Sequence, residues 1–459
     1  MSELIAGIAR ADITPPVGML MAGYAARKTP AAGVHDELHA VALYLTDGIT
    51  EAGLITADII GINADGTARV REACTAASGV PGENVFVAFS HTHGGPQTDL
   101  RRTDDVDELK KAYGTILVHK MAGALSEAKG GAAPVRMGYG RQDCSFAMNR
   151  RERKPDGVVV LGVNPEGPTT PFAEVIRLDR LDTKEPLALI FSYASHGTTM
   201  GGDNLFYTAD YPGQAKSFVD KQFPTALSSF MAGCSGDINP YPRGEFRHVE
   251  RHGNRLGCAV SQAALDIGED DMAEDVRIAV ACHEFKFQLG EKLSIDEAKE
   301  RLEKAQAAAD KELERARQAA GDKPVDEENA LNWFTRRTLR GAKALVEALE
   351  KGEAEFGIPA ETQTLAIGDC AIVGMPGEIF VKIGMAVAEQ SPFARTISIS
   401  HANGAVGYVP TADQVPLGGY EVQHARASKY AIFIAPESDQ VLIDSALTSL
   451  RDCYDKLNG

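Results

Sequence analysis

The segment SHTHGGP (residues 90–96) has the residues best suited to chemistry, and it follows directly on an apolar run. In extended backbone, side chains two positions apart project to the same face, so His91 and His93 can both point into one site. One imidazole could bind a metal ion while the other acts on a substrate. The pattern also occurs in unrelated metallohydrolases, and a purely structural role is the alternative. The adjacent glycines and proline favour close approach of the backbone to a ligand.

Two more candidates end apolar segments elsewhere in the chain. His196 closes the run LALIFSYASH (187–196), and Glu378 follows the run AIVGM and a Pro-Gly pair. The alternatives are a hydrogen-bonded structural histidine and a carboxylate that caps the helix expected behind it. Two histidines and one carboxylate are a common ligand set of catalytic zinc, which leaves a position for water.

Several segments together resemble the neutral/alkaline ceramidase family. They occur in the family's order: ADITPP (11–16), GVHD (33–36), the SHTHGGP turn, the strand that ends at His196, PGE (376–378) and GYVPT (407–411). The resemblance covers most of the chain apart from a helical segment. It implies zinc ligation by His91, His196, Glu378 and, through its phenolic oxygen, Tyr408. Phenolate ligation is chemically reasonable because a cation lowers the pKa of a phenol.

The same resemblance implies that His93, Arg150 and Tyr420 act on the scissile carbonyl. The chain departs from the family in the segment GDINPY (236–241), where Asn239 stands at the position of the family's catalytic serine. An amide is no nucleophile, so Asn239 is expected to position the substrate or to donate a hydrogen bond. The sequence therefore predicts attack by metal-activated water instead of a serine acyl-enzyme.

The expected fold class is α/β, a mixed-sheet ceramidase-like catalytic domain. Apolar and β-branched runs predict strands at residues 40–48, 51–60, 84–91, 187–196, 362–378 and 394–402. Amphipathic periodicity predicts helices at residues 67–78, 105–129, 379–390 and 438–457. The candidate residues then fall at strand ends, where α/β folds usually place their sites.

Residues 293–351 differ in composition from the rest of the chain, since Ala, Glu, Lys and Arg dominate them. Ser294 and Glu297 form a capping box, and apolar residues follow at spacings of three and four. The break GDKP (321–324) precedes a second helical pattern. We expect one ceramidase-like catalytic domain over residues 1–459, with an antiparallel helical hairpin inserted at 293–351. A solvated structural insertion is favoured over a lid or a dimerisation arm.

Charge and composition exclude some classes of partner. The chain has 459 residues, of which 44% are hydrophobic and 24% are charged, as in ordinary folded proteins. Lys and Arg number 47 against 64 Asp and Glu, a formal net charge of -17. This charge repels phosphate backbones and anionic membrane surfaces, so we expect neither nucleic acid nor stable membrane association. A neutral or zwitterionic small-molecule substrate is easier to accommodate.

A cytoplasmic location is expected. The amino terminus lacks the pattern of a secretory signal, and no window has roughly 18 uninterrupted apolar residues. The seven cysteines are scattered, without a Cys-x-x-Cys pair, which favours reduced thiols. The sequence leaves the oligomeric state open, homo-oligomers included.

The predicted function is zinc-dependent hydrolysis of an amide (N-acyl) bond, on a small soluble substrate in preference to ceramide. An esterase or lactonase at the same zinc site is the nearest alternative. An amidohydrolase barrel would need a later metal-binding aspartate and eight regular βα units, which the consecutive strands disfavour. A non-catalytic metal-binding homologue is the alternative from another class. It is disfavoured because every metal-ligand position is filled.

Overall fold

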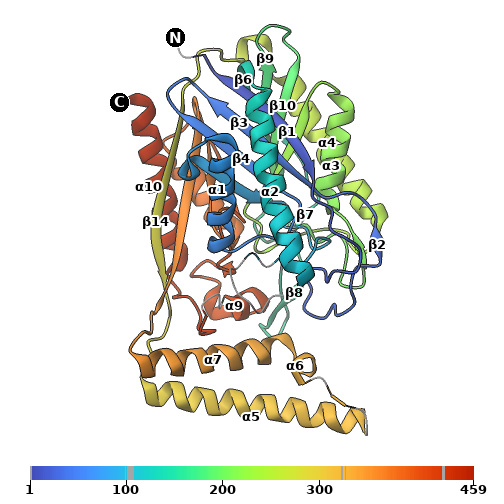
Figure 1. Ribbon diagram of the computed structural model, residues 1–459, viewed down its shortest axis with the longest axis vertical. Helices are drawn as coiled ribbons and strands as arrows, with labels where there is room; N and C mark the ends of the chain where they lie inside the picture. The colour runs from blue at the N-terminus through green and yellow to red at the C-terminus, as the bar shows by residue number, and fades with distance from the viewer. Residues whose placement is uncertain (1–2, 99, 101–107, 322–323, 326, 426–428) are drawn as a thin grey trace.

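The computed structural model describes residues 3–98, 100, 108–321, 324–325, 327–425 and 429–459 (Figure 1). Within these ranges the strands form one sheet of eight strands, here the large sheet, one of four, here the small sheet, and one of three. Two-stranded ladders complete the β structure.

The large sheet is mixed and has the order β12-β10-β9-β6-β1-β3-β4-β5. Its strands are β1 (Ile5–Asp12), β3 (His39–Thr46), β4 (Glu51–Ala57), β5 (Val85–Phe89), β6 (Ala133–Asp143), β9 (Phe172–Arg180), β10 (Pro186–Tyr193) and β12 (Leu227–Ala232). The sheet curls, because the buried hydroxyls of Thr56 on β4 and Ser229 on β12 are 2.8 Å apart although these strands lie near opposite edges. The ends of β5 and β10 are thereby brought together.

Four helices cover one face of the large sheet: α1 (Ala64–Ser78), α2 (Glu108–Gly130), α3 (Asp210–Gln222) and α4 (Phe246–Asp266) (Figure 1). The apolar stripe of α2 faces inward, with Leu117, Met121 and Leu125 fully buried at helical spacing. Burial of each such side chain contributes roughly 1.5–3 kcal/mol.

The other face of the large sheet packs on the small sheet. The small sheet has the order β14-β15-β16-β18, with β14 (Ile278–Gln288), β15 (Gly357–Ile367), β16 (Cys370–Gly374) and β18 (Arg395–Ile399). Side chains of both sheets share one buried core, and helices α8 (Val381–Gln390) and α10 (Ser438–Asn458) cover the outer face of the small sheet. The body is therefore a four-layer αββα arrangement.

Shorter elements supply much of the candidate site. The three-stranded sheet has the order β13-β7-β8, with β13 (Ile238–Pro240), β7 (Ala147–Arg153) and β8 (Val159–Asn164). The two-stranded ladders join β2 (Gly33–Val34) to β11 (Phe206–Tyr207), and β17 (Glu378–Ile379) to β19 (Tyr408–Val409). Short helices are α6 (Glu327–Ala330), α9 (Tyr420–His424), η1 (Gly82–Asn84), η2 (Glu269–Asp271) and η3 (Val415–Leu417).

Helices α5 (Ile295–Ala320) and α7 (Trp333–Lys351) lie side by side below the body, with α9 between α7 and the sheets (Figure 1). The predicted capping box is present, because the Ser294 backbone N–H donates to Glu297 and the Glu297 N–H donates to the Ser294 hydroxyl. The α5–α7 pair contacts the body through Gly341, which packs against Tyr430, and Arg301, which donates to the Ala431 carbonyl over 2.7 Å.

The predicted α/β class is confirmed, and each predicted strand is present. The run 362–378 proves to contain the end of β15 and all of β16, joined by a turn at Gly368, and it ends on the first residue of β17. The predicted helices correspond to α1, α2, α8 and α10, although residues 105–107 of the second lie outside the described residues. Helices α3 and α4 were not predicted.

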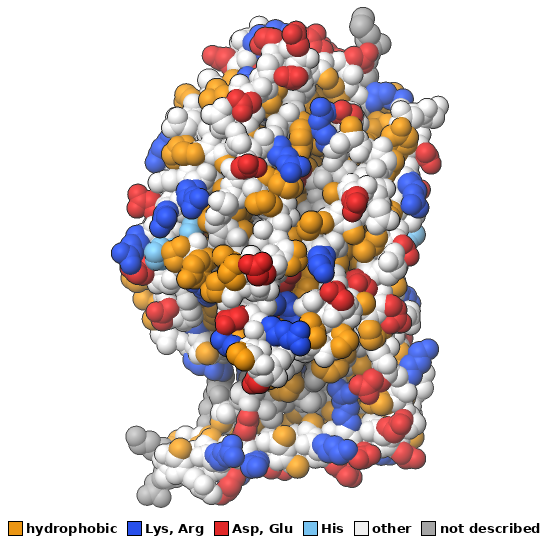
Figure 2. Space-filling view, turned by 180° about the vertical axis from the view of Figure 1, so that it is seen from behind, with side chains coloured by type: hydrophobic (Ala, Val, Ile, Leu, Met, Phe, Trp, Pro, Cys, Tyr) orange, Lys and Arg blue, Asp and Glu red, His pale blue; other side chains and the backbone are white. Residues whose placement is uncertain are grey.

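No helix among the described residues is both long and apolar enough to cross a membrane. Acidic and basic side chains alternate over the face drawn in Figure 2, without a large area of one sign. The seven cysteines, all within the described ranges, are free thiols.

Candidate metal centre

The two histidines that follow apolar strands meet at the closing edge of the curled sheet. His91 lies just beyond β5 and His196 just beyond β10, and both are buried. A parallel bridge between Thr92 and Gly197 joins the two segments, and the His93 N–H donates to the Gly197 carbonyl over 2.9 Å. The imidazole centroids of His91 and His196 are 4.9 Å apart.

Backbone carbonyls fix the orientation of both rings. Nδ1 of His91 is 2.6 Å from the Ile60 carbonyl oxygen, and Nδ1 of His196 is 2.6 Å from the Ser235 carbonyl oxygen. A carbonyl oxygen only accepts, so each Nδ1 has the proton and donates. The Nε2 atom of each neutral ring is then an unprotonated acceptor that faces the interior of the centre.

A two-stranded ladder brings Glu378 and Tyr408 to the same place. β17 and β19 are parallel, with Glu378 directly opposite Tyr408, so the two side chains are neighbours. Gly377, with a φ of 117°, permits the ladder because a Cβ there would lie 2.5 Å from the Gly407 carbonyl oxygen. Glu378 Oε2 lies 3.0 Å from Nε2 of His196 and 3.7 Å from Nε2 of His91.

His93 also belongs to the cluster, through its contact with His91. Its Nε2 is 3.3 Å from Nε2 of His91. The loop before β2 fixes the ring, since Tyr24 contacts it edge-on and Arg27 donates to the His93 carbonyl over 2.6 Å. Gly23 lies against the ring so closely that a Cβ would be 2.4 Å from His93 Cγ.

These distances fit a metal ion better than a metal-free arrangement. His91, His93 and His196 each offer a nitrogen within 4.8 Å of the others. The unprotonated Nε2 of His196 faces a carboxylate oxygen, so two acceptors stand 3.0 Å apart with no proton between them. A cation at the common focus removes that repulsion. Imidazole nitrogen and carboxylate oxygen are typical ligands of zinc and of other divalent transition metals.

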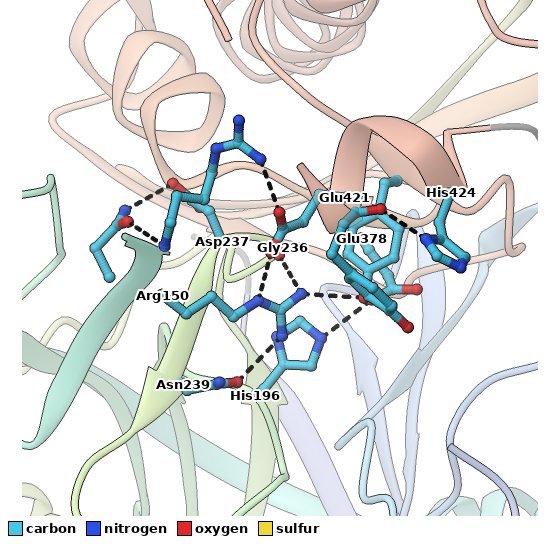
Figure 3. A network of polar contacts seen from close by, with 12 residues as sticks. Arg150, His196, Gly236, Asp237, Asn239, Glu378, Glu421 and His424 are labelled. Atoms are coloured by element: carbon cyan, nitrogen blue, oxygen red, sulfur yellow. Dashed lines mark hydrogen bonds and ion pairs between the residues drawn. The ribbon is translucent and has the colours of Figure 1, made fainter. Parts of the chain in front are cut away.

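Arg150 lies beside the histidines and is bound on every side (Figure 3). Its Nε donates to Glu421 over 2.8 Å and its Nη1 to Asn239 Oδ1 over 3.1 Å. Its Nη2 donates to the Gly236 carbonyl and to the Tyr408 hydroxyl oxygen, over 2.7 and 3.0 Å. The guanidinium therefore fixes Asn239 and Tyr408 in relation to each other.

Glu421 is a buried carboxylate shared by two guanidinium groups. Its Oε1 accepts from Arg150, and its Oε2 accepts from Arg151 over 2.7 Å. Because Glu421 belongs to α9, these ion pairs fix that helix against β7. Tyr420, the preceding residue, is 38% exposed, and its ring lies 5.9 Å from that of Tyr408. Tyr420 is thus the predicted site residue most open to a bound substrate.

Burial changes the proton affinities of the centre. Burial and, secondarily, Arg150 lower the pKa of His196 to about 4. Burial and the neighbouring imidazoles lower the pKa of His93 well below its usual range. Burial and the Glu378 carboxylate raise the pKa of Tyr408 well above 10, and the pKa of Tyr420 is raised for the same reasons. Without a cation His93 and His196 are neutral and both phenols keep their protons at neutral pH.

The predicted site residues occupy one connected region. His91, His196, Glu378 and Tyr408 adjoin one another, and His93, Arg150, Asn239 and Tyr420 surround them. Two other buried aspartates of the region have structural partners. Asp58 accepts from Lys216 over 2.6 Å, and Asp237 accepts from the backbone N–H of Val381 over 2.9 Å.

Sequence reasoning missed His401 and Glu421. His401 is buried, stacks on His91 with centroids 3.7 Å apart, and has a φ of 56°. It follows the apolar run of β18, the same signal that singled out His91 and His196, so the pattern could have identified it. Glu421 has no such signal, because its role depends on arginines some 270 residues away.

Comparison with known proteins supports the fold. No protein-family model matches the sequence, and no curated protein matches it either. Among solved structures, one described as a ceramidase complexed with C2 matches with a TM-score of 0.70 over 98% of this chain and 76% of its own, at 18% identity. The chain has a ceramidase-like fold. The neutral ceramidase of Pseudomonas aeruginosa matches with a TM-score of 0.69 over 98% of this chain and 75% of its own, at 17% identity.

The buried histidines predict that protein stripped of metal is unstable in acid. The native pKa of His196 is about 4, against 6.5 for an ordinary histidine, so the unfolded chain binds its proton first. Stability should therefore fall as pH decreases from 6.5 to about 4, by about 3 kcal/mol from His196. Urea unfolding in the presence of a chelator measures this loss. The His196→Gln variant should have a shallower pH dependence, and parallel profiles would contradict the assignment.

Proposed function

We propose that this protein is a zinc-dependent hydrolase that cleaves the amide bond of small, soluble N-acyl compounds. The observation that supports it most is the convergence of acceptor atoms from His91, His196 and Glu378 within a ceramidase-like fold. Such a cluster is costly to bury unless a cation occupies it.

In this proposal His91, His196, Glu378 and Tyr408 hold the metal. Zinc suits two imidazoles and a carboxylate, and when bound it supplies the Lewis acidity that makes water more acidic and a carbonyl more electrophilic. Tyr408 would join as a phenolate. Burial and Glu378 oppose its ionisation, whereas the bound cation and the hydrogen bond from Arg150 favour it.

The surrounding side chains would accept a proton from water and stabilise the negative charge that develops on the substrate oxygen. His93 is neutral at neutral pH and can accept a proton from attacking water at its Nε2. Tyr420 keeps its phenolic proton and is partly exposed, so it can donate to the oxygen that becomes negative. One such donor is worth roughly 3 kcal/mol of barrier.

Asn239 and Arg150 would have different tasks. The Asn239 Oδ1 already accepts from Arg150 and from Thr198, so its amide N–H groups are oriented the other way, for a substrate acceptor. The Nε and Nη2 atoms of Arg150 already donate hydrogen bonds to protein oxygens. We therefore assign Arg150 the task of positioning Tyr408 and Asn239, and Tyr420 that of binding the oxyanion.

An ester or lactone is the second candidate substrate. The lowered pKa of His93 makes it a weak general base toward attacking water, and an amide, with its poorer leaving group, needs more help from such a base than an ester does. Alkoxide leaving groups need less of this help. A matched pair of N-acyl and O-acyl compounds with the same acyl group compares the two directly.

We predict one tightly bound zinc ion per chain. His91→Ala and His196→Ala should each remove it and lower kcat by about a thousandfold or more, because both supply ligands. Elemental analysis after dialysis, together with turnover, measures the effect. His119→Ala, which changes an exposed histidine on α2, is the matched control and should retain metal and activity. An active wild-type protein free of metal would end this proposal.

We predict that soluble N-acyl amines have a kcat/KM at least about tenfold above that of long-chain ceramide, a difference of about 1.4 kcal/mol. The net charge of -17 opposes approach to the anionic membrane surfaces where a long-chain lipid resides. Assays in neutral and in anionic mixed micelles separate the effect of charge from substrate preference. A higher kcat/KM for ceramide in neutral micelles would contradict the prediction.

We predict hydrolysis without an acyl-enzyme, because Asn239 cannot act as a nucleophile. Hydroxylamine should then give little hydroxamate beyond the uncatalysed background, and mass spectrometry of quenched reactions should find no acylated peptide. Ser90, Ser195 and Ser235 are the serines to inspect, because each is buried next to the histidine ligands or their carbonyl partners. An acyl group on any of them would establish a serine nucleophile instead.

A further inference from the structure

A cavity of about 340 Å³ lies apart from the residues of the metal centre. It is bounded by the inner face of the large sheet at β6, β9 and β10, by β18 and by the first turns of α8. None of the residues proposed to hold metal or to act on the substrate lines it. The cavity is therefore a separate compartment of the fold.

Three polar side chains lie in a row across the sheet at this cavity. Arg141 on β6 is directly opposite Glu174 on β9, and Glu174 is directly opposite Ser192 on β10. Directly opposed residues on neighbouring strands project to the same face, and all three line the cavity. The row has one negative charge next to one positive charge.

Arg141 and Glu174 are nevertheless not paired with each other. Cross-strand neighbours of opposite charge usually attract, with Cβ atoms about 5 Å apart. Here the Arg141 guanidinium lies over the Phe172 ring, 3.2 Å from its centroid, and Glu174 Oε1 accepts from the Tyr139 hydroxyl over 2.8 Å. In the described part of the chain no ion pair joins the two, and Glu174 Oε2 has no donor.

Two other polar residues at the cavity, Arg395 and Ser398, do not pair with Arg141 or Glu174. Arg395, at the rim, already forms an ion pair with Asp369. Ser398 lines the cavity, and its buried hydroxyl has no hydrogen-bond partner among the described residues. Burial raises the pKa of Glu174, so a cation next to this carboxylate would lower its electrostatic cost.

We propose that this cavity binds a free α-amino acid. The ammonium group would bind among Glu174 Oε2, Ser192 Oγ and Ser398 Oγ, three oxygens for its three N–H donors. The carboxylate would bind Arg141, which is exposed at the rim and can turn away from Phe172. A zwitterion matches the row better than a lone cation or anion, because it satisfies both unpaired charges at once.

The cavity also adjoins the segments that carry the metal centre. Ala194 lies two residues before His196, Cys234 precedes Ser235, and Val381 lies three residues after Glu378. An amino acid bound here would contact the backbone that orients the histidines without entering the centre. This inference does not rest on the proposed function.

Isothermal titration of the full-length, metal-loaded protein tests the proposal, with each standard amino acid as probe and methylamine and acetate as single-charge comparisons. At least one amino acid should bind with one-to-one stoichiometry, about tenfold or more tighter than methylamine or acetate. Glu174→Gln and Arg141→Gln should each weaken this binding by about tenfold or more. Glu166→Gln, which changes an exposed carboxylate elsewhere, should leave it unchanged.

The variants also distinguish the cavity from the metal centre, which could itself chelate an amino acid. Glutamine keeps the oxygen that accepts from Tyr139, and thermal unfolding confirms that the variant is folded. His91→Ala should retain amino-acid binding. Binding that disappears in His91→Ala but persists in Glu174→Gln would assign it to the metal centre and overturn the proposal. Failure of every amino acid to bind at millimolar concentration would overturn it as well.

Discussion

The centre depends on two hydrogen bonds, from Nδ1 of His91 to the Ile60 carbonyl and from Nδ1 of His196 to the Ser235 carbonyl. They place the unprotonated nitrogen of His196 against the carboxylate of Glu378, a contact that a bound metal ion would relieve at neutral pH. The curled sheet serves this geometry because it brings together the ends of strands from its two edges. Burial of this cluster costs stability, and a bound cation would offset part of that cost.

A second group of charged residues, Glu421, Arg150 and Arg151, positions the side chains around the centre. Glu421 forms ion pairs with both Arg150 and Arg151 in the interior, and removal of one partner from such a buried group costs roughly 3–5 kcal/mol. Through Arg150 this carboxylate fixes Tyr408 and Asn239, and as part of α9 it fixes Tyr420. One carboxylate therefore sets the relative positions of three groups from three different elements.

Much of this could be predicted from the sequence, for identifiable reasons. Apolar runs that end in histidine gave the strands and placed His91 and His196 at their ends. The pairing of Glu378 with Tyr408 needed the family resemblance, because a ladder between residues thirty positions apart has no local signal. Helix α3 escaped prediction because Pro212 and Gly213 resemble helix breakers, and α4 escaped it because Gly253 and Gly257 do. In the structure they lie one turn apart and let α4 approach α3, against Gln214 and Phe218.

The contact between the α5–α7 pair and α9 bears on how proteins of this fold diverge. The ring centroids of Phe334 on α7 and His424 are 6.3 Å apart, and the His424 ring is tilted against the Tyr420 ring with centroids 4.1 Å apart. A mutation of Phe334 leaves the candidate ligand positions unchanged, yet only the His424 side chain separates it from Tyr420. Under the proposed function, α7 is therefore a place where variation between proteins of this fold would alter substrate preference without a change in the histidines of the centre.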